Sequence, residues 1–365
     1  MDARAAYRGC LVGGAAGDAL GYAVEFLDEQ AIRARYGTAG ITAYELDWQG
    51  VAEISDDTQM TLYTANGLLL CAAERRQGLG SDWAEAVGRC YRDWLRTQQG
   101  GGAGDWAWLN DVPALHHPRA PGNTCMGALA QPMLGSIARP INASKGCGGV
   151  MRVAPVGLFL GESMAAEELQ RVAAECAALT HGHPLGYIPA GMLAHLVHLA
   201  AHEPALPLGD AVAAAMATAR TAFAGTAPEQ LARMDALVEL ALQLAEADMD
   251  DPNAIHRLGE GWVGEEALAI AIYCAVKYAE DFDRGMIAAV NHRGDSDSTG
   301  AVAGNILGAR LGLAGIPPKY RRCLELTDVL LEVADDLLDG PPAAQSTPAA
   351  QARWAQKYEA HHRAE

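Results

Sequence analysis

The strongest constraint on the fold of this chain is the helical spacing of its apolar residues. Intervals of three and four recur in residues 163–180, 210–223, 228–247, 265–279 and 317–338. Alternating β-branched runs are almost absent, and residues 40–46 and 51–54 are too short to build a sheet. We therefore expect an all-α protein, in which Ser163 caps the first of these helices and Pro317 and Pro318 occupy the first turn of the last.

Glycine- and proline-rich segments interrupt the helices without dividing them into separate units. Residues 100–104, 113–122, 145–149 and 292–294 are expected as loops, where binding and catalytic groups are often found. Half of the 365 residues are hydrophobic, which is enough for one large core. We expect a single domain over residues 1–340. Residues 341–365 are expected to form a peripheral C-terminal segment with one helix around 350–361.

The charge of the chain excludes several functions. It has 27 Lys and Arg against 45 Asp and Glu, a net charge of −18, whereas a nucleic-acid or anionic-membrane binder needs a basic face. No apolar stretch approaches the 20 or so residues of a transmembrane helix, and the first nine residues lack a signal-peptide pattern. The eight cysteines form no Cys-x-x-Cys pair, so neither a zinc site nor a disulfide framework is indicated, and a cytoplasmic location is expected.

Two acidic clusters stand about 240 residues apart, Ser55-Asp56-Asp57-Thr58 and Asp295-Ser296-Asp297-Ser298, each before a helical run. A helix N-terminus offsets part of the repulsion between neighbouring aspartates, and a divalent cation offsets more. Carboxylate and hydroxyl oxygens favour Mg²⁺, Mn²⁺ or Ca²⁺ over Zn²⁺. An EF-hand is excluded because Ile306 stands where the loop needs a glutamate. Two divalent cations would neutralise the four aspartates; the alternative is a pair of helix caps with solvated carboxylates.

These clusters and their surroundings resemble the ADP-ribosylglycohydrolase family, which includes dinitrogenase reductase-activating glycohydrolases and ADP-ribosyl-acceptor hydrolases. The similar motifs follow the family order at residues 13–21, 24–26, 55–58, 142–152, 180–181, 264–268 and 294–300. The resemblance implies a compact all-α bundle with a two-metal centre, of Mg²⁺ or Mn²⁺, in a central cleft. It also implies hydrolysis of the glycosidic bond between ADP-ribose and an acceptor.

The resemblance assigns the metal ligands residue by residue. One set is Ser55, Asp56 and Asp57; the other is Asp295, Asp297 and Ser298, with Asp297 where the family's bridging ligand falls. The two serines replace threonines common in the family and keep a hydroxyl ligand. Asp56 or Asp57 could accept the proton of the attacking water. Glu25 is expected as a conditional ligand or acid/base, and the alternative is a surface carboxylate near the end of the first helix.

The substrate would meet the glycine-rich stretch after residue 145. Glycine backbone N–H groups can approach a pyrophosphate closely. The expected substrate-binding residues are Gly146, Gly148, Gly149, Met151, Arg152 and His181. Arg152 could instead be a structural salt-bridge partner. A zinc pair of His181 and His183 is excluded because no third soft ligand is near. Asp105 or Asp111 could be an additional acid/base.

Removal of ADP-ribose from a modified protein side chain, most readily arginine, is the expected activity. The alternatives are the same chemistry on ADP-ribosyl-serine or on a small ADP-ribose conjugate, or a mainly binding role, as in immunity proteins that block a toxin. The oligomeric state stays open. The Gly-x-x-x-Gly spacing of Gly300, Gly304 and Gly308 predicts close helix packing behind the metal site rather than membrane association.

Overall fold

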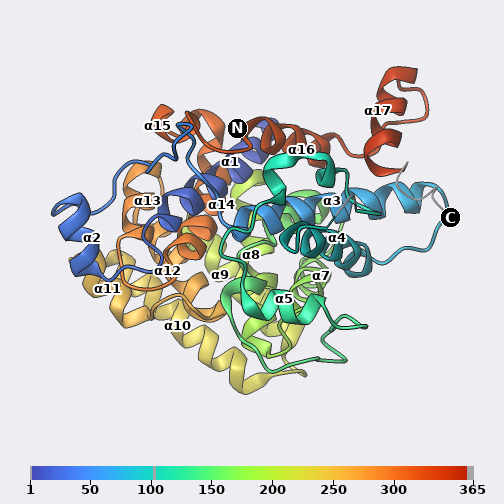
Figure 1. The fold of residues 1–365 in the computed structure, drawn as a ribbon. Coiled ribbons are helices and arrows are strands. Elements are labelled where there is room, and N and C mark those ends of the chain that lie inside the picture. The colour runs from blue at the N-terminus through green and yellow to red at the C-terminus, as the bar shows by residue number, and fades with distance from the viewer. Residues whose placement is uncertain (1, 102–103, 360–365) are drawn as a thin grey trace.

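The computed structural model describes residues 2–101 and 104–359, and over these ranges helices and loops build the protein (Figure 1). The α-helices are α1 (Ala3–Tyr22), α2 (Glu29–Tyr36), α3 (Asp56–Arg76), α4 (Trp83–Gln98), α5 (Asn123–Leu129), α6 (Ala154–Leu160), α7 (Ala166–Ala178), α8 (Pro184–His202), α9 (Leu208–Phe223), α10 (Pro228–Glu246), α11 (Asp251–Leu258), α12 (Gly264–Lys277), α13 (Phe282–Val290), α14 (Ser296–Gly315), α15 (Pro318–Arg321), α16 (Thr327–Asp339) and α17 (Pro348–Tyr358). Short 3-10 turns are η1 (Trp108–Asp111), η2 (Pro113–His116) and η3 (Cys147–Gly149). The described ranges contain no strand beyond two isolated bridges, so the all-α expectation is confirmed.

Most of the expected helices are present, and two expectations were wrong. Ser163 does not cap α7, whose N-cap is Ala165; the Ser163 hydroxyl instead donates to the Leu160 carbonyl at 3.0 Å. The segment 317–338 is not one helix but α15 and α16, separated at residues 322–326. The helix breaks because this segment pairs with Ala52, whose N–H donates to the Cys323 carbonyl at 2.7 Å. Helical periodicity cannot reveal a partner so distant in the sequence.

Helices α1 and α14 lie side by side near the centre of the molecule (Figure 1). Their glycines meet in pairs, and a Cβ on Gly17 would lie 1.9 Å from the Gly300 carbonyl oxygen. A Cβ on Gly13 would lie 2.4 Å from the corresponding oxygen of Gly304. Only glycine allows this backbone approach, so the close packing expected from the Gly-x-x-x-Gly spacing is confirmed. It places the end of α1 against the start of α14.

The C-terminal segment folds onto the body through α17, at the edge of the view in Figure 1. Trp354 and Tyr358 are buried within the same connected apolar core as the other helices. The Tyr358 hydroxyl donates to Asp336 of α16 at 2.7 Å. A helix was expected over 350–361; α17 begins at Pro348, and residues 360–361 lie outside the described residues, as do 102–103 of the expected loop 100–104. The division of the chain at residue 340 stays a prediction.

A search of the described helices for length and apolarity found none suited to crossing a bilayer.

Candidate metal centre and substrate pocket

One pocket of about 210 Å³ collects most of the side chains singled out in the sequence. It is lined by Glu25 after α1, by Asp56 and Asp57 of α3, and by Asp295, Asp297 and Ser298 at the start of α14. Gly146, Gly148, Met151 and His181 also line it. The fold thus brings together two acidic clusters that are distant in sequence. The volume lies below the roughly 300–1,000 Å³ of sites for drug-sized ligands, so a larger ligand would extend outside it.

Three carboxylates in this pocket are close enough to share a cation. One ligand oxygen each from Glu25, Asp295 and Asp297 lies within 4.8 Å of the other two. Glu25 Oε2 and Asp57 Oδ2 are buried and have no hydrogen-bond partner among the described residues. Buried carboxylate oxygens without a donor are costly unless a cation or proton meets them. The donor set of this pocket therefore fits hard divalent cations.

The α3 side of the pocket is built by helix capping. Ser55 is the N-cap of α3 and its hydroxyl accepts from the Asp57 N–H at 3.2 Å. Asp56 Oδ2 accepts from the Gly122 N–H at 3.1 Å, which orients one carboxylate toward the pocket. Ser55 itself is fully buried and does not line the pocket.

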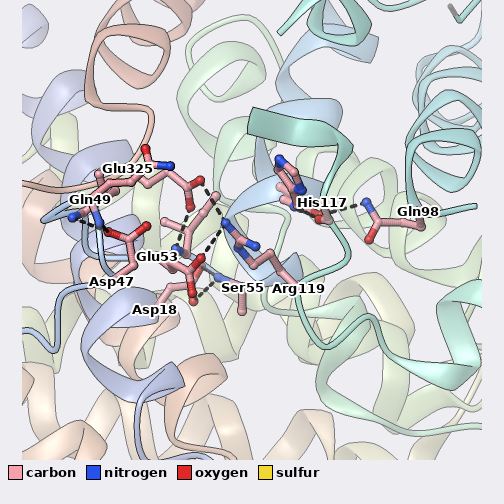
Figure 2. A network of polar contacts seen from close by, with 12 residues as sticks. Asp18, Asp47, Gln49, Glu53, Ser55, Gln98, His117, Arg119 and Glu325 are labelled. Atoms are coloured by element: carbon pink, nitrogen blue, oxygen red, sulfur yellow. Dashed lines mark hydrogen bonds and ion pairs between the residues drawn. The ribbon is translucent and has the colours of Figure 1, made fainter. Parts of the chain in front are cut away.

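Asp18 of α1 anchors the start of α3 (Figure 2). Its carboxylate accepts from the Ser55 N–H at 2.9 Å and from the Thr58 N–H at 3.0 Å, and also from the Thr58 hydroxyl. Asp18 lies within the family-like motif at residues 13–21, but no role for it was expected from the sequence. A carboxylate inside a run of glycine and alanine was the signal that could have found it.

A second set of contacts in Figure 2 holds the loop that covers the pocket. The Arg119 guanidinium pairs with Glu53 at 2.9 Å and Glu325 at 3.3 Å. The Arg119 carbonyl accepts from the Asp56 N–H at 3.0 Å, which joins this loop to the first turn of α3. Its attachment keeps the Gly122 N–H in place for Asp56.

Burial and mutual repulsion raise the pKa of nearly every carboxyl group in the pocket. The pKa of Glu25 rises to about 10 through burial first and then through the charges of Asp297 and Asp295. The same causes hold the pKa values of Asp57 and Asp295 well above the usual range. Bound cations would supply the positive charge that these groups otherwise take from protons.

The glycine-rich loop approaches His181 closely. A Cβ on Gly148 would lie 3.0 Å from His181 Cε1, and one on Gly146 would lie 3.2 Å from His181 Nε2. Burial and then the Arg152 charge lower the pKa of His181 to about 3, so its imidazole is neutral near pH 7. Beside this loop the pocket therefore presents an uncharged ring rather than a cationic side chain.

Comparison with known proteins decides the family. A family model described as ADP-ribosylglycohydrolase matches residues 1–347. The chain belongs to the ADP-ribosylglycohydrolase family. An uncharacterised protein of Archaeoglobus fulgidus is 28% identical over 343 residues, covering 91% of this chain and 96% of that protein.

Two other relatives carry the name ADP-ribosylhydrolase ARH3. The one from Homo sapiens is 28% identical over 214 residues, or 52% of this chain and 57% of the human protein. The one from Mus musculus is 25% identical over 371 residues, covering 89% of this chain and 90% of its own. A solved chain named ADP-ribosylglycohydrolase-related protein complex aligns with a TM-score of 0.59 at 23% identity, covering 92% of this chain and 98% of that one. This last likeness shows a shared fold.

Family membership supports ADP-ribosyl hydrolase activity for the pocket, but not all of the expected residues face it. Arg152 is fully buried behind the pocket, and its guanidinium donates to Thr180 Oγ1 at 2.7 Å and stacks over the Tyr91 ring at 4.4 Å. Arg152 therefore has interior partners here, and its expected contact with a phosphate stays a prediction. Gly149 also lies behind the pocket, where its Cβ would come within 2.3 Å of the Gly186 carbonyl.

The two additional acid/base candidates of the glycohydrolase lie away from its pocket. Asp105 pairs with Arg96 at 2.7 Å, and neither Asp105 nor Asp111 lines the pocket. An additional acid/base role for either residue stays a prediction.

Several residues that line the pocket were not expected from the sequence, and Cys147 and Trp262 are two of them. Cys147 places its Sγ 2.7 Å from Asp295 Oδ2. Trp262 reaches the pocket from the segment before α12. Both residues are positioned by contacts with segments more than 100 residues away, which a local sequence pattern does not reveal.

Proposed function

We propose that this glycohydrolase releases ADP-ribose from a modified arginine side chain of a protein, and that it needs two divalent cations, Mg²⁺ or Mn²⁺, to do so. One observation carries the proposal. Five carboxylates converge on a pocket that a glycine-rich loop also lines: Glu25, Asp56, Asp57, Asp295 and Asp297. Acidic oxygens suit metal and ribose, and backbone N–H groups suit a pyrophosphate.

The two acidic clusters would hold the cations. Ser55, Asp56 and Asp57 supply one ligand set, and Asp295, Asp297 and Ser298 supply the other. The unpartnered oxygens of Glu25 and Asp57 support this assignment. When bound, such a pair of cations supplies the charge that orients a ribose diol and makes a water more acidic.

The chain's own groups account for the rest of the chemistry. The Glu25 carboxyl group lies in the cluster with one oxygen free of hydrogen bonds, so it can hold or release a proton beside the scissile bond. The Gly122 N–H holds Asp56 in a fixed orientation, which lets that carboxylate accept a proton from water. Gly146 and Gly148 leave room for the diphosphate beside a neutral His181. Together these groups serve the needs of glycosidic hydrolysis: a positioned water, a stabilised ribose cation and a protonated leaving group.

Serine-linked ADP-ribose is the second candidate substrate, and the position of Glu25 favours it. In serine-acting members of the family the matching glutamate is implicated in catalysis, and here Glu25 belongs to the carboxylate cluster. A small ADP-ribose conjugate would meet the same groups. A mainly binding role, including immunity against an ADP-ribosylating toxin, would not need the acidic residues to be complete.

A release assay tests the proposal. ADP-ribosyl peptides linked through arginine, serine or cysteine are incubated with the protein and Mg²⁺ or Mn²⁺, and free ADP-ribose is measured. We expect release from the arginine-linked peptide, abolished in Asp297→Ala and retained in Asp328→Ala, a matched change at an exposed aspartate of α16. Wild-type rates in Asp297→Ala with Mg²⁺ present would refute the two-metal centre. Release from the serine-linked peptide alone would reassign the acceptor.

A further inference from the structure

An exposed aromatic pair stands at the rim of the pocket. Phe26 and Trp262 stack with ring centroids 6.4 Å apart and planes inclined by 23°. Phe26 is 73% exposed and Trp262 is 40% exposed, whereas most large apolar side chains of the described chain are buried. Phe26 directly follows Glu25 of the carboxylate cluster, and Trp262 itself lines the pocket. The pair therefore borders the acidic end of the pocket.

The backbone that carries Trp262 is fixed between the two loops that build the site. The Trp262 carbonyl accepts from the Cys147 N–H at 3.2 Å, which ties it to the glycine-rich loop. The neighbouring Glu260 carbonyl accepts from the Asp295 N–H at 2.8 Å, which ties it to the metal motif. Gly261 between them has φ of 85°, a conformation that favours glycine. These two backbone hydrogen bonds thus hold the segment that carries the exposed indole at the edge of the pocket.

The charge at this rim suits a cation on the substrate. The pocket lining contains five carboxylates and neither lysine nor arginine, and His181 is neutral near pH 7. Two divalent cations would cancel four of the five negative charges and leave one. A guanidinium group is planar, weakly hydrated and always charged, and it stacks readily on aromatic faces.

We propose that Phe26 and Trp262 form the acceptor subsite, where the guanidinium of an ADP-ribosyl-arginine substrate stacks against the aromatic pair while its ribose lies at the carboxylate cluster. This inference rests on the proposed hydrolase function and deepens it by naming the group that selects the acceptor. A serine linkage carries no cation and gains nothing from the pair. The subsite therefore favours arginine over serine.

Two substitutions test the subsite. In Trp262→Leu and Phe26→Leu, we expect kcat/KM for the arginine-linked peptide to fall about 5- to 25-fold, equal to about 1 to 2 kcal/mol at 1.4 kcal/mol per tenfold. The value for the serine-linked peptide and the dissociation constant of free ADP-ribose, measured by calorimetry with Mg²⁺, should change less than twofold. The conservative variant Trp262→Phe should recover most of the arginine rate because it keeps a ring.

A matched control separates the subsite from a general effect of losing an exposed ring. Trp48 is 90% exposed and does not line the pocket, so Trp48→Leu should leave both substrates unaffected. Equal losses on the arginine and serine peptides, or no loss on either, would overturn the subsite while leaving the hydrolase function intact.

A different result would bear on the hydrolase function itself. A wild-type protein that cleaves neither peptide would refute the proposed activity, and the dissociation constants of the two uncleaved peptides would then test the pair alone. In that case tighter binding of the arginine peptide, weakened by Trp262→Leu, supports the subsite, and equal binding of the two peptides overturns it.

Discussion

Replacing Gly304 with alanine tests how the two halves of the acidic pocket are held together. A Cβ at this position of α14 would lie 2.0 Å from the Gly13 carbonyl oxygen and 3.1 Å from Gly14 Cα. Real Cβ atoms essentially never come within 3.0 Å of such atoms. Helices α1 and α14 would therefore have to separate by about 1 Å, a backbone shift of the kind that makes overpacked cores unstable.

The structure allows the size of the effect to be worked out. Forcing the new Cβ against backbone atoms should cost about 3 kcal/mol, the upper end of the usual destabilisation by overpacking. The better helix propensity of alanine should offset about 0.5–1 kcal/mol of this loss. We expect Gly304→Ala to lose roughly 2 kcal/mol of unfolding free energy. With a urea m-value of about 3 kcal/mol/M, the midpoint falls by roughly 0.7 M.

The assay is urea unfolding followed by far-ultraviolet circular dichroism, with Gly209→Ala as the matched control. A Cβ on Gly209 of α9 meets no atom within 4 Å, so this variant should be unchanged or more stable by up to about 1 kcal/mol. Since α1 leads to Glu25 and α14 starts beside Asp297, Gly304→Ala should also weaken Mg²⁺ binding measured by calorimetry. Wild-type stability and Mg²⁺ affinity in Gly304→Ala would refute the argument that glycine contact sets the spacing of the site.

Three other predictions concern the acidic groups. Treatment with EDTA should abolish ADP-ribose release while helical circular dichroism persists, because the helices have their own apolar core; simultaneous loss of both signals would mean that the cations are structural. In EDTA-treated protein, stability should fall between pH 7 and 8.5, because the folded-state pKa of Glu25 is raised to about 10 from 4.5 and stability is lost as pH rises between these values. The free energy of unfolding should fall by up to about 1.4 kcal/mol per pH unit for each such group, and the fall should be shallower in Glu25→Gln. If urea titrations of the wild-type protein give the same unfolding free energy across this pH range, the reasoning is contradicted. Finally, Asp18→Asn replaces one of the acceptor oxygens that face the Ser55 and Thr58 N–H groups with a donor. The Mg²⁺ affinity and the free energy of unfolding should both fall, the latter by about 1–3 kcal/mol. An unchanged Mg²⁺ dissociation constant would show that Asp18 does not orient the first turn of α3.

The acidic residues that line the pocket were predictable because their signal is local. Asp56 and Asp57 are adjacent, and Asp295 and Asp297 are separated by one serine. Both pairs stand at helix starts, and repulsion within each pair already points to a cation. The resemblance then joined the two clusters into one centre, and the structure places them around one pocket. Asp18 escaped this reasoning because it stands alone within α1, and its function depends on N–H groups of a different helix.

Substrate contacts were harder to predict, because facing a pocket is a property of the packed molecule. Arg152 follows the glycine-rich loop in sequence, yet its guanidinium turns inward to Thr180 and Tyr91. Trp262 has no polar or catalytic signature, yet a hydrogen bond to the Cys147 N–H brings it to the pocket rim.

The sequence by itself determined the all-α class and the acidic chemistry of the pocket, because helical periodicity and side-chain oxygen type are local properties of the residues. The packing of α1 on α14 was also readable, since Gly300, Gly304 and Gly308 form one face of a helix at four-residue intervals. Only the tertiary structure decided where the helix expected over 317–338 breaks and which side chains enter the pocket. Both depend on contacts between distant segments, such as Ala52 with Cys323 and Trp262 with Cys147, and these form only when the whole chain has packed.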